Sequence, residues 1–292
     1  MKLRLHVLLG ILILSMVKGS FATISAKQYG TILNLSGKQR MLSQKMSKEV
    51  VLVALNIAKT KNLSSLKKTK DLFDITLQGL RDGNSTLGLP ATKSRRILRQ
   101  LQKIFMIWTP FKKVINTITT SKNVTKNQVA IIAKDSLPLL KQMNKCVKLY
   151  EKEAAAGGLK SDPGLAVAIN LSGKQRMLTQ KMSKEFFLIA YGHQVKDNQL
   201  NLVETSQLFD RTLKGLINGD AVLDLKKTKN PKIVAQLNVV TKLWNSFKVS
   251  IDYATHESKI PMDKINKIAK DNMPLLKNMN KAVGMYAKEA GK

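Results

Sequence analysis

Two copies of one polar sequence stand 136 positions apart in this chain of 292 residues. Residues 34–49 read NLSGKQRMLSQKMSKE, and residues 170–185 read NLSGKQRMLTQKMSKE. The copies differ only at Ser43 and Thr179, a change that keeps the hydroxyl group. The segments that follow, 56–70 and 192–206, share only three of fifteen positions. Core packing alone seldom constrains lysine, glutamine and arginine so closely, so we expect function in this repeated sequence, hereafter the box.

The box offers donors for an anion but no carboxylate near them. Arg40 and Arg176 carry guanidinium groups, which bind planar anions through paired hydrogen bonds. The only acid of each copy, Glu49 or Glu185, lies more than two helical turns away. Because an arginine at a helix–helix contact needs a negative partner, we expect an anion from outside the chain to supply it.

The duplication extends over almost the whole chain without a gap, and its pattern is helical. Apolar residues recur with the helical period, and no stretch alternates as a strand would. Four helices joined by short turns are typical of an up-down bundle. The sequence therefore predicts an all-α fold of two tandem four-helix bundles. The expected helices are 25–60, 64–82, 92–120 and 124–155 in the first unit, and 163–196, 199–217, 230–256 and 261–290 in the second.

The first helix of each unit has two apolar faces. Ile32, Leu42 and Met46 mark the face that is expected to contact the unit's own core. The opposite face carries Leu33, Gly37, Arg40, Met41 and Gln44, and the second unit repeats it with Ile169, Gly173, Arg176, Met177 and Gln180. A glycine in mid-helix costs about 0.5–1 kcal/mol relative to alanine, and we expect these two to admit a neighbouring backbone. We predict that the two first helices pack together about a pseudo-twofold axis.

That packing would bring Arg40 and Arg176 face to face. A small planar anion between them would replace like-charge repulsion with charge-assisted hydrogen bonds. Binding that closes or shifts the helix pair is how a sensor reports occupancy. The alternative is that the box only packs two helices and that Arg40 reaches solvent.

The N-terminal residues have the pattern of an export signal. Lys2 and Arg4 precede an apolar run at 7–17, and Ser20-Phe21-Ala22 follows as a small-x-small cleavage site. The run is shorter than the ~20 residues that span a bilayer. We expect residues 1–22 to be a cleaved signal peptide and the rest to be a soluble periplasmic protein without a transmembrane anchor, with units at 23–157 and 158–292.

The net charge of +31 points to anionic partners. Removal of Lys2, Arg4 and Lys18 with the signal leaves +28, and such a field concentrates anions at the surface. Export disfavours nucleic acid, so a small anion, anionic lipid or lipopolysaccharide remain. A competing interpretation is a structural or adhesive protein that binds polyanions or an anionic membrane surface through this charge. The charge is also compatible with an ordinary solvated surface.

Enzyme chemistry, a metal and a cofactor have little support in the sequence. His193 and His256 stand opposite Ile57 and Thr120 in the other copy, so neither belongs to a repeated set of ligands. No cysteine, histidine and carboxylate cluster has ligand spacing, and no nucleophile or phosphate-loop motif is present. Cys146 is the only cysteine, which excludes an internal disulfide. We predict neither a catalytic residue nor a metal ligand nor a cofactor.

The box resembles the signature of the PilJ-like domain, the N-terminal sensory module of type IV pilus methyl-accepting transducers. It is also similar to the periplasmic box of nitrate/nitrite sensor histidine kinases. The resemblance implies a four-helix bundle in which a glycine backbone and the box arginine hold nitrate between the first helices of two subunits. Carried onto this chain, with the glutamines of the same helix face, the ligand-binding residues are Asn34, Gly37, Arg40 and Gln44, and Asn170, Gly173, Arg176 and Gln180.

The resemblance also implies a role. We expect a periplasmic ligand-binding sensor that binds nitrate or nitrite between the two box helices and signals to a membrane-bound histidine kinase or chemotaxis receptor. The receptors of this family are membrane-anchored and carry signalling domains, which we expect this chain to lack. Two boxes in one chain suggest that an internal pair replaces the homodimer.

Overall fold

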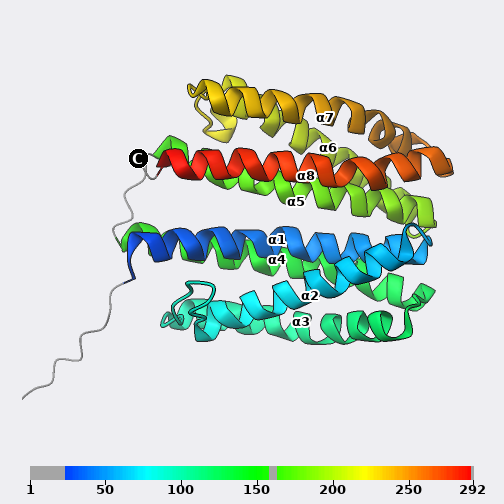
Figure 1. The fold of residues 1–292 in the computed structure, drawn as a ribbon, viewed down its shortest axis with the longest axis horizontal. Coiled ribbons are helices and arrows are strands. Elements are labelled where there is room, and N and C mark those ends of the chain that lie inside the picture. Colours follow the sequence, from blue (N-terminus) through cyan, green and yellow to red (C-terminus); the bar gives the residue numbers. More distant parts are fainter. Residues whose placement is uncertain (1–23, 158–162, 291–292) are drawn as a thin grey trace, which may run out of the picture.

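The computed structural model describes residues 24–157 and 163–290, and within them it is an assembly of two helical bundles (Figure 1). The predicted signal peptide lies outside the described residues. The first bundle consists of α1 (Ala26–Ala54), α2 (Lys59–Asp82), α3 (Arg95–Ser121) and α4 (Lys126–Ala156). The second consists of α5 (Pro163–Tyr191), α6 (Val195–Asn218), the short 3-10 turn η1 (Ala221–Leu223), α7 (Pro231–His256) and α8 (Met262–Ala290). The predicted fold class is confirmed.

The bundles lie side by side, with the box helices in the middle (Figure 1). Within each bundle, consecutive helices pack on one another, and the first packs on the last. Across the bundles, α1 packs on α5, so each box helix is covered on two sides. Helices α3 and α7 form the two outer layers (Figure 1).

Each bundle has its own aromatic centre. In the first, the rings of Phe73 and Trp108 lie 4.4 Å apart, and the indole Nε1 of Trp108 donates to Asp74 at 2.7 Å. The second bundle repeats this arrangement with Phe209 and Trp244. Burial of such large rings supplies much of the hydrophobic stabilisation of a bundle, so each unit can hold its own box helix in place.

Local sequence explains where several helices begin. Ser25 accepts a hydrogen bond from the backbone of Gln28, whose side chain bonds back to Ser25, and Thr125 forms the same capping box with Gln128. These boxes satisfy amide groups that the helix leaves unpaired. Pro231 occupies the first turn of α7, where a missing N–H has no cost.

The predicted ends of the box helices are wrong. The helix expected at 25–60 ends at Ala54, and the next begins at Lys59 rather than at residue 64. The turn uses left-handed backbone at Asn56 and Ala58, with φ of 59° and 41°. Asparagine adopts this conformation more often than most non-glycine residues, whereas alanine seldom does. Neither glycine nor proline marks the turn in the sequence. In the second unit, the helix expected at 163–196 ends at Tyr191, and the helix expected at 199–217 begins at Val195.

Candidate anion site between the bundles

Helices α1 and α5 meet along the faces that carry the box arginines, and we call this interface the seam. The two helices run in the same direction, because Arg40 contacts Asn170 while Gln44, one turn later, contacts Lys184. Met41 and Met177 are buried on these faces. The predicted pairing of the two first helices is therefore confirmed.

Arg40 lies buried in the seam with neutral partners. Its side chain is only 8% exposed. Nη2 reaches Oδ1 of Asn170 across the seam at 3.5 Å, Nη1 reaches Oδ1 of Asn144 at 3.5 Å, and Nε reaches the carbonyl of Gly37 at 3.4 Å. These contacts are long for hydrogen bonds, so the guanidinium keeps most of its capacity to donate.

Arg176 occupies the equivalent position in the second unit and is 6% exposed. Its Nη1 donates to Oδ1 of Asn280 at 2.8 Å, and its Nε reaches the carbonyl of Gly173 at 3.5 Å. Burial and, to a smaller extent, the positive charge of Arg40 lower the pKa of Arg176 to about 10. Across residues 24–157 and 163–290, no carboxylate forms an ion pair with either arginine.

The two arginines differ in one neighbour that the sequence analysis did not single out. Burial lowers the pKa of Arg40, but the charge of Glu151 on α4 opposes that shift. At the equivalent place on α8 stands Ala287. The positive charge of Arg176 therefore lacks the nearby carboxylate that partly offsets the charge of Arg40. The signal was present in the sequence as an acid in one copy opposite an alanine in the other.

The box asparagines differ in their surroundings. Asn170 is half-buried and accepts the contact from Arg40. Asn34 is exposed. The structure thus brings Arg40, Arg176 and Asn170 together in the seam and places Asn34 at its edge.

The expectation for the glycines is wrong. A Cβ atom built on Gly37 would meet only Nη2 of Arg40, at 3.5 Å, and one on Gly173 would meet only Nη2 of Arg176, at 3.6 Å. No neighbouring backbone lies within 4 Å of the Cβ position of either glycine. Instead, each arginine folds back over the glycine one turn earlier on its own helix. The carbonyl of each glycine faces the Nε of that arginine.

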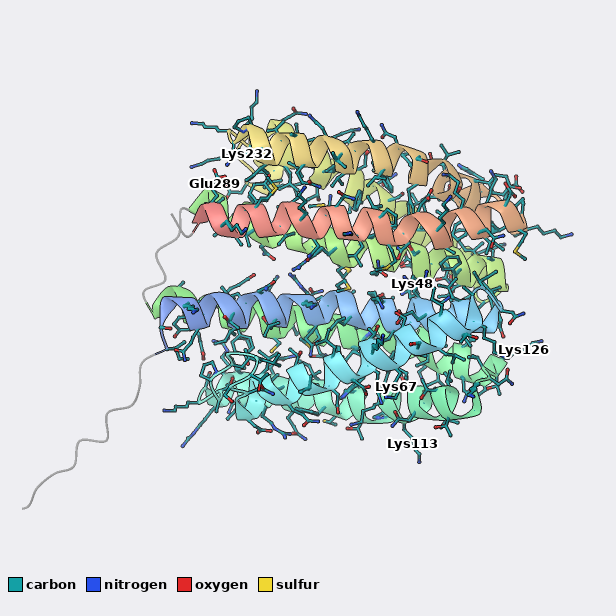
Figure 2. All side chains as sticks on the ribbon, in the orientation of Figure 1. Lys48, Lys67, Lys113, Lys126, Lys232 and Glu289 are labelled. Carbon is teal, nitrogen blue, oxygen red and sulfur yellow. The ribbon has the colours of Figure 1, made fainter. Side chains whose placement is uncertain are left out.

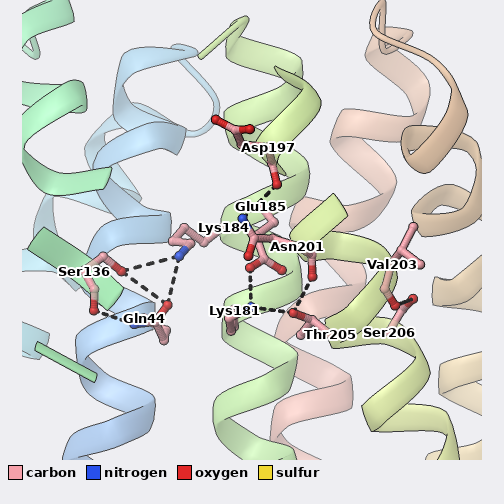
Figure 3. Close-up of polar contacts among 10 residues, drawn as sticks. All are labelled: Gln44, Ser136, Lys181, Lys184, Glu185, Asp197, Asn201, Val203, Thr205 and Ser206. Carbon is pink, nitrogen blue, oxygen red and sulfur yellow. Dashed lines mark hydrogen bonds and ion pairs between the residues drawn. The ribbon is translucent and has the colours of Figure 1, made fainter. Parts of the chain in front are cut away.

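The box glutamines lie one turn beyond the arginines, in a network with two buried lysines. Lys184 reaches from α5 across the seam, and its Nζ donates to Oε1 of Gln44 at 3.1 Å and contacts Oγ of Ser136 at 3.5 Å (Figure 3). Lys48 reaches the other way, from α1 to Oδ1 of Asn272 on α8, at 2.6 Å. Gln180 donates to the same Asn272 oxygen at 3.1 Å.

These lysines were missed by the sequence analysis. Lys48 is 4% and Lys184 2% exposed, whereas Lys113 and Lys232 project outward from α3 and α7 (Figure 2). Burial lowers the pKa of each buried lysine to about 8, against the opposing charge of the adjacent Glu49 or Glu185. The seam therefore holds four buried basic groups whose direct partners are neutral.

Other box residues have structural partners that explain their repetition. Gln39 donates to the carbonyl of Phe73 at 2.8 Å. Lys45 pairs with Glu49 and donates to Ser65 and Thr69 on α2. The second unit repeats these contacts with Gln175, Lys181 and Glu185. Much of the box thus ties each first helix to its own bundle, which leaves the arginines and the buried lysines to the seam.

The described part of the chain has neither a candidate metal cluster nor a candidate membrane-spanning helix. Among those residues, no group of three or more histidine, cysteine, aspartate or glutamate side chains has an arrangement that could hold a metal ion. Within the same residues, no helix combines the length and the apolarity needed to cross a bilayer.

Comparison with known families decides the classification. The family described as the N-terminal region of type IV pili methyl-accepting chemotaxis transducers, PilJ, matches residues 21–133 and again residues 159–267. The chain belongs to the PilJ family. The two matched segments show that it carries two tandem PilJ-like sensory domains, as the repeated box predicted.

Individual PilJ relatives are more distant. The methyl-accepting chemotaxis protein McpN of Pseudomonas aeruginosa is 30% identical over 84 residues, which are 29% of this chain and 15% of McpN. This chain therefore matches only a small part of that receptor's length. The solved ligand-binding domain of the P. aeruginosa nitrate receptor McpN is 24% identical, with a TM-score of 0.39, and the match covers 45% of this chain and 99% of that domain. These relatives are sensor domains of chemoreceptors rather than enzymes.

Proposed function

We propose that this chain is a periplasmic sensor protein that binds a small anion, nitrate or nitrite, in the seam between α1 and α5. The observation that carries the proposal is the pair of buried guanidinium groups of Arg40 and Arg176, which have only neutral hydrogen-bond partners. A buried cation without a counter-ion is costly. An anion between the two groups would lower that cost while using donors that are already aimed at the seam.

The roles of the site residues follow from their contacts. Arg40 and Arg176 would donate to the anion, and Asn170 would position Arg40 from the opposite helix. The carbonyls of Gly37 and Gly173 would hold the Nε groups of the two arginines, and Asn34 would lie at the rim. Gln44 and Gln180, engaged with the buried lysines and with Asn272, would transmit the change in the seam. Direct contact of these two glutamines with the ligand stays a prediction.

Electrostatics gives the binding step a mechanical consequence. Two unit charges ~4–8 Å apart at an effective dielectric near 20 repel by about 2–4 kcal/mol. Neutralisation of that repulsion would tighten or shift α1 against α5. A ligand that binds one arrangement of the pair better than the other shifts the population towards it. The altered surface would then be recognised by a membrane-bound chemoreceptor or sensor kinase. The family and the sequence match to the chemotaxis receptor McpN support this choice of partner.

Isothermal calorimetry with sodium nitrate tests the proposal. Two charge-assisted hydrogen bonds are worth about 1.5–3 kcal/mol each, so Arg40→Ala with Arg176→Ala should weaken nitrate binding by at least about 100-fold. Arg211→Ala is the matched control, because Arg211 forms an exposed pair with Asp220 far from the box in sequence. Unchanged nitrate affinity in the double variant would refute the site.

The second candidate is a binder of polyanions or of an anionic membrane surface, favoured by the outer helix α3. That helix contains no acidic residue and exposes Arg95, Arg96, Arg99, Lys103 and Lys113. Thermal unfolding with nitrate, nitrite, chloride, sulfate and small carboxylates separates the two functions. A saturable shift with one small ion supports the receptor, whereas a graded shift with every anion and steep salt dependence supports the polyanion binder.

A further inference from the structure

A groove of about 440 Å³ opens beside the seam, between α1 and α2 of the first bundle and α5 and α8 of the second. Its volume is in the range of sites for small organic ligands, and nitrate would fill only a small part of it. Five basic side chains line it, and no acidic residue does: Lys38, Lys45, Lys68, Lys277 and Arg176.

The charges gather at the two ends of the groove. Lys38 and Lys45 are seven residues apart on α1, which separates their backbones by about 10 Å. At one end, Lys38 and Arg176 both line the groove. Burial and, after it, the charge of Arg176 lower the pKa of Lys38. At the other end, Lys45 donates to Ser65 and Thr69, and this places the neighbouring Lys68 there too. Lys45 is paired with Glu49, whereas no described carboxylate pairs with Lys68 or Lys38.

The middle of the groove is apolar. Met41 and Leu42 of α1 lie between the two charged ends in sequence, and Leu72 and Leu276 line the groove from α2 and α8. Leu42 and Leu276 are buried at the floor. An inorganic ion would gain nothing from this surface, whereas a hydrocarbon body would bury apolar area against it.

The internal duplication supplies a comparison within the chain. The positions equivalent to the groove on the other flank of the seam conserve most of its character, with Lys174, Lys141 and Arg40 opposite Lys38, Lys277 and Arg176. One charge is reversed, since Glu204 stands where the groove has Lys68. The acid Glu151 lies near Arg40, and its equivalent near Arg176 is an alanine. Lys148, which lies near Lys174 and has Gly284 as its equivalent, offsets Glu151. The charge reversal at Lys68 therefore makes the flank with Arg176 the more positive one.

We propose that this groove is a second binding site, for an organic dianion with a negative group at each end of an apolar body, such as a medium-chain dicarboxylate. One carboxylate contacts Lys38 and Arg176, the other contacts Lys68, and the methylene chain lies on the leucines and methionine between them. The site goes beyond the seam site for a small inorganic anion. It shares Arg176 with that site but depends on Lys68 and on the apolar floor, which the seam site does not use.

Calorimetry with suberate, an eight-carbon dicarboxylate, tests the second site. Octanoate is the comparison ligand, because it has the same chain length but only one charge. Suberate should bind one site per chain, and octanoate should bind at least about tenfold more weakly, because a charge-assisted contact is worth about 1.5–3 kcal/mol. Lys68→Glu should weaken suberate binding by at least tenfold. Lys67→Glu is the matched control, because this neighbouring side chain is solvent-exposed and changes the net charge equally.

The reciprocal variant Glu204→Lys should raise the number of suberate sites from one to two. Lys68 and Glu204 are not buried, and thermal unfolding of each variant verifies the fold. Nitrate titrations of the same variants keep the two proposals apart, because Lys68→Glu should leave nitrate affinity unchanged. Absence of suberate binding to the unaltered chain, equal binding of octanoate, or wild-type suberate affinity in Lys68→Glu would each overturn the groove site, whatever nitrate does.

Discussion

Replacement of the two buried seam lysines should remove a pH dependence of stability. Lys48 and Lys184 each have a pKa of about 8 in the folded protein, against the ordinary lysine value of 10.5. Between these values the unfolded chain binds more protons than the folded one. The free energy of unfolding therefore rises with pH in this window and is flat below it. Linkage gives a rise of about 1 kcal/mol per lysine between about pH 7.5 and 9, so about 2 kcal/mol for both.

The assay is urea unfolding at several pH values, for the unaltered chain and for Lys48→Met with Lys184→Met. Methionine retains a long apolar side chain but cannot carry the charge, so the double variant should lose about 2 kcal/mol of the rise. Cys146 has the opposite effect at the upper end of the window, because burial raises its pKa to about 12 from 9.0. Both proteins should therefore carry Cys146→Ala, the residue that the other unit has at Ala282.

Other groups that titrate in the same range remain in both proteins. Burial also lowers the pKa of Lys38 and Lys174, so the unaltered chain should show a larger total rise than the two seam lysines alone produce. The difference between the two proteins isolates the seam. Equal slopes of stability against pH would refute the view that these lysines are charged and buried in the seam.

Two further changes test other parts of the box. Gly37→Ala and Gly173→Ala should each raise the free energy of urea unfolding by about 0.5–1 kcal/mol, because the added Cβ meets the following arginine only at ordinary contact distance. Gly284→Ala is the reference, since a Cβ there has no neighbour within 4 Å. A loss of stability at the two box glycines but not at Gly284 would show that the guanidinium groups cannot accommodate the added methyl group. Lys45→Met should lower the free energy of urea unfolding by about 3 kcal/mol, because it leaves the buried Glu49 without its ionic partner. A loss of less than about 1 kcal/mol at neutral pH would contradict the ion pair between these two side chains.

The architecture was predictable because it depends on patterns that repeat along the chain. Apolar residues at helical spacing predicted two four-helix bundles, and the second apolar face around Met41 predicted contact between the box helices. The ends of those helices were not predictable in the same way. The turn after α1 uses left-handed backbone at Asn56 and Ala58. Asparagine tolerates this conformation but alanine does not favour it, and neither glycine nor proline marks the turn.

Side-chain burial was harder to predict than helix pairing. The sequence pointed to Arg40 and Arg176 because a guanidinium on an apolar face is unusual, and the structure places both in the seam. Lys48 and Lys184 gave no such signal, since a lysine on a helix normally extends its ammonium group to water. Their burial depends on amide acceptors from Gln44 and Asn272, and the second of these lies on a helix distant in sequence.

Because both box helices belong to one polypeptide, formation of the seam is an intramolecular event. Linkage of two binding surfaces gives them an effective local concentration that is typically millimolar for short linkers. Dilution of the protein therefore does not separate the paired helices, as it would separate two weakly associating subunits. Under the proposed function, the response to a solute would then stay constant over a wide range of expression levels.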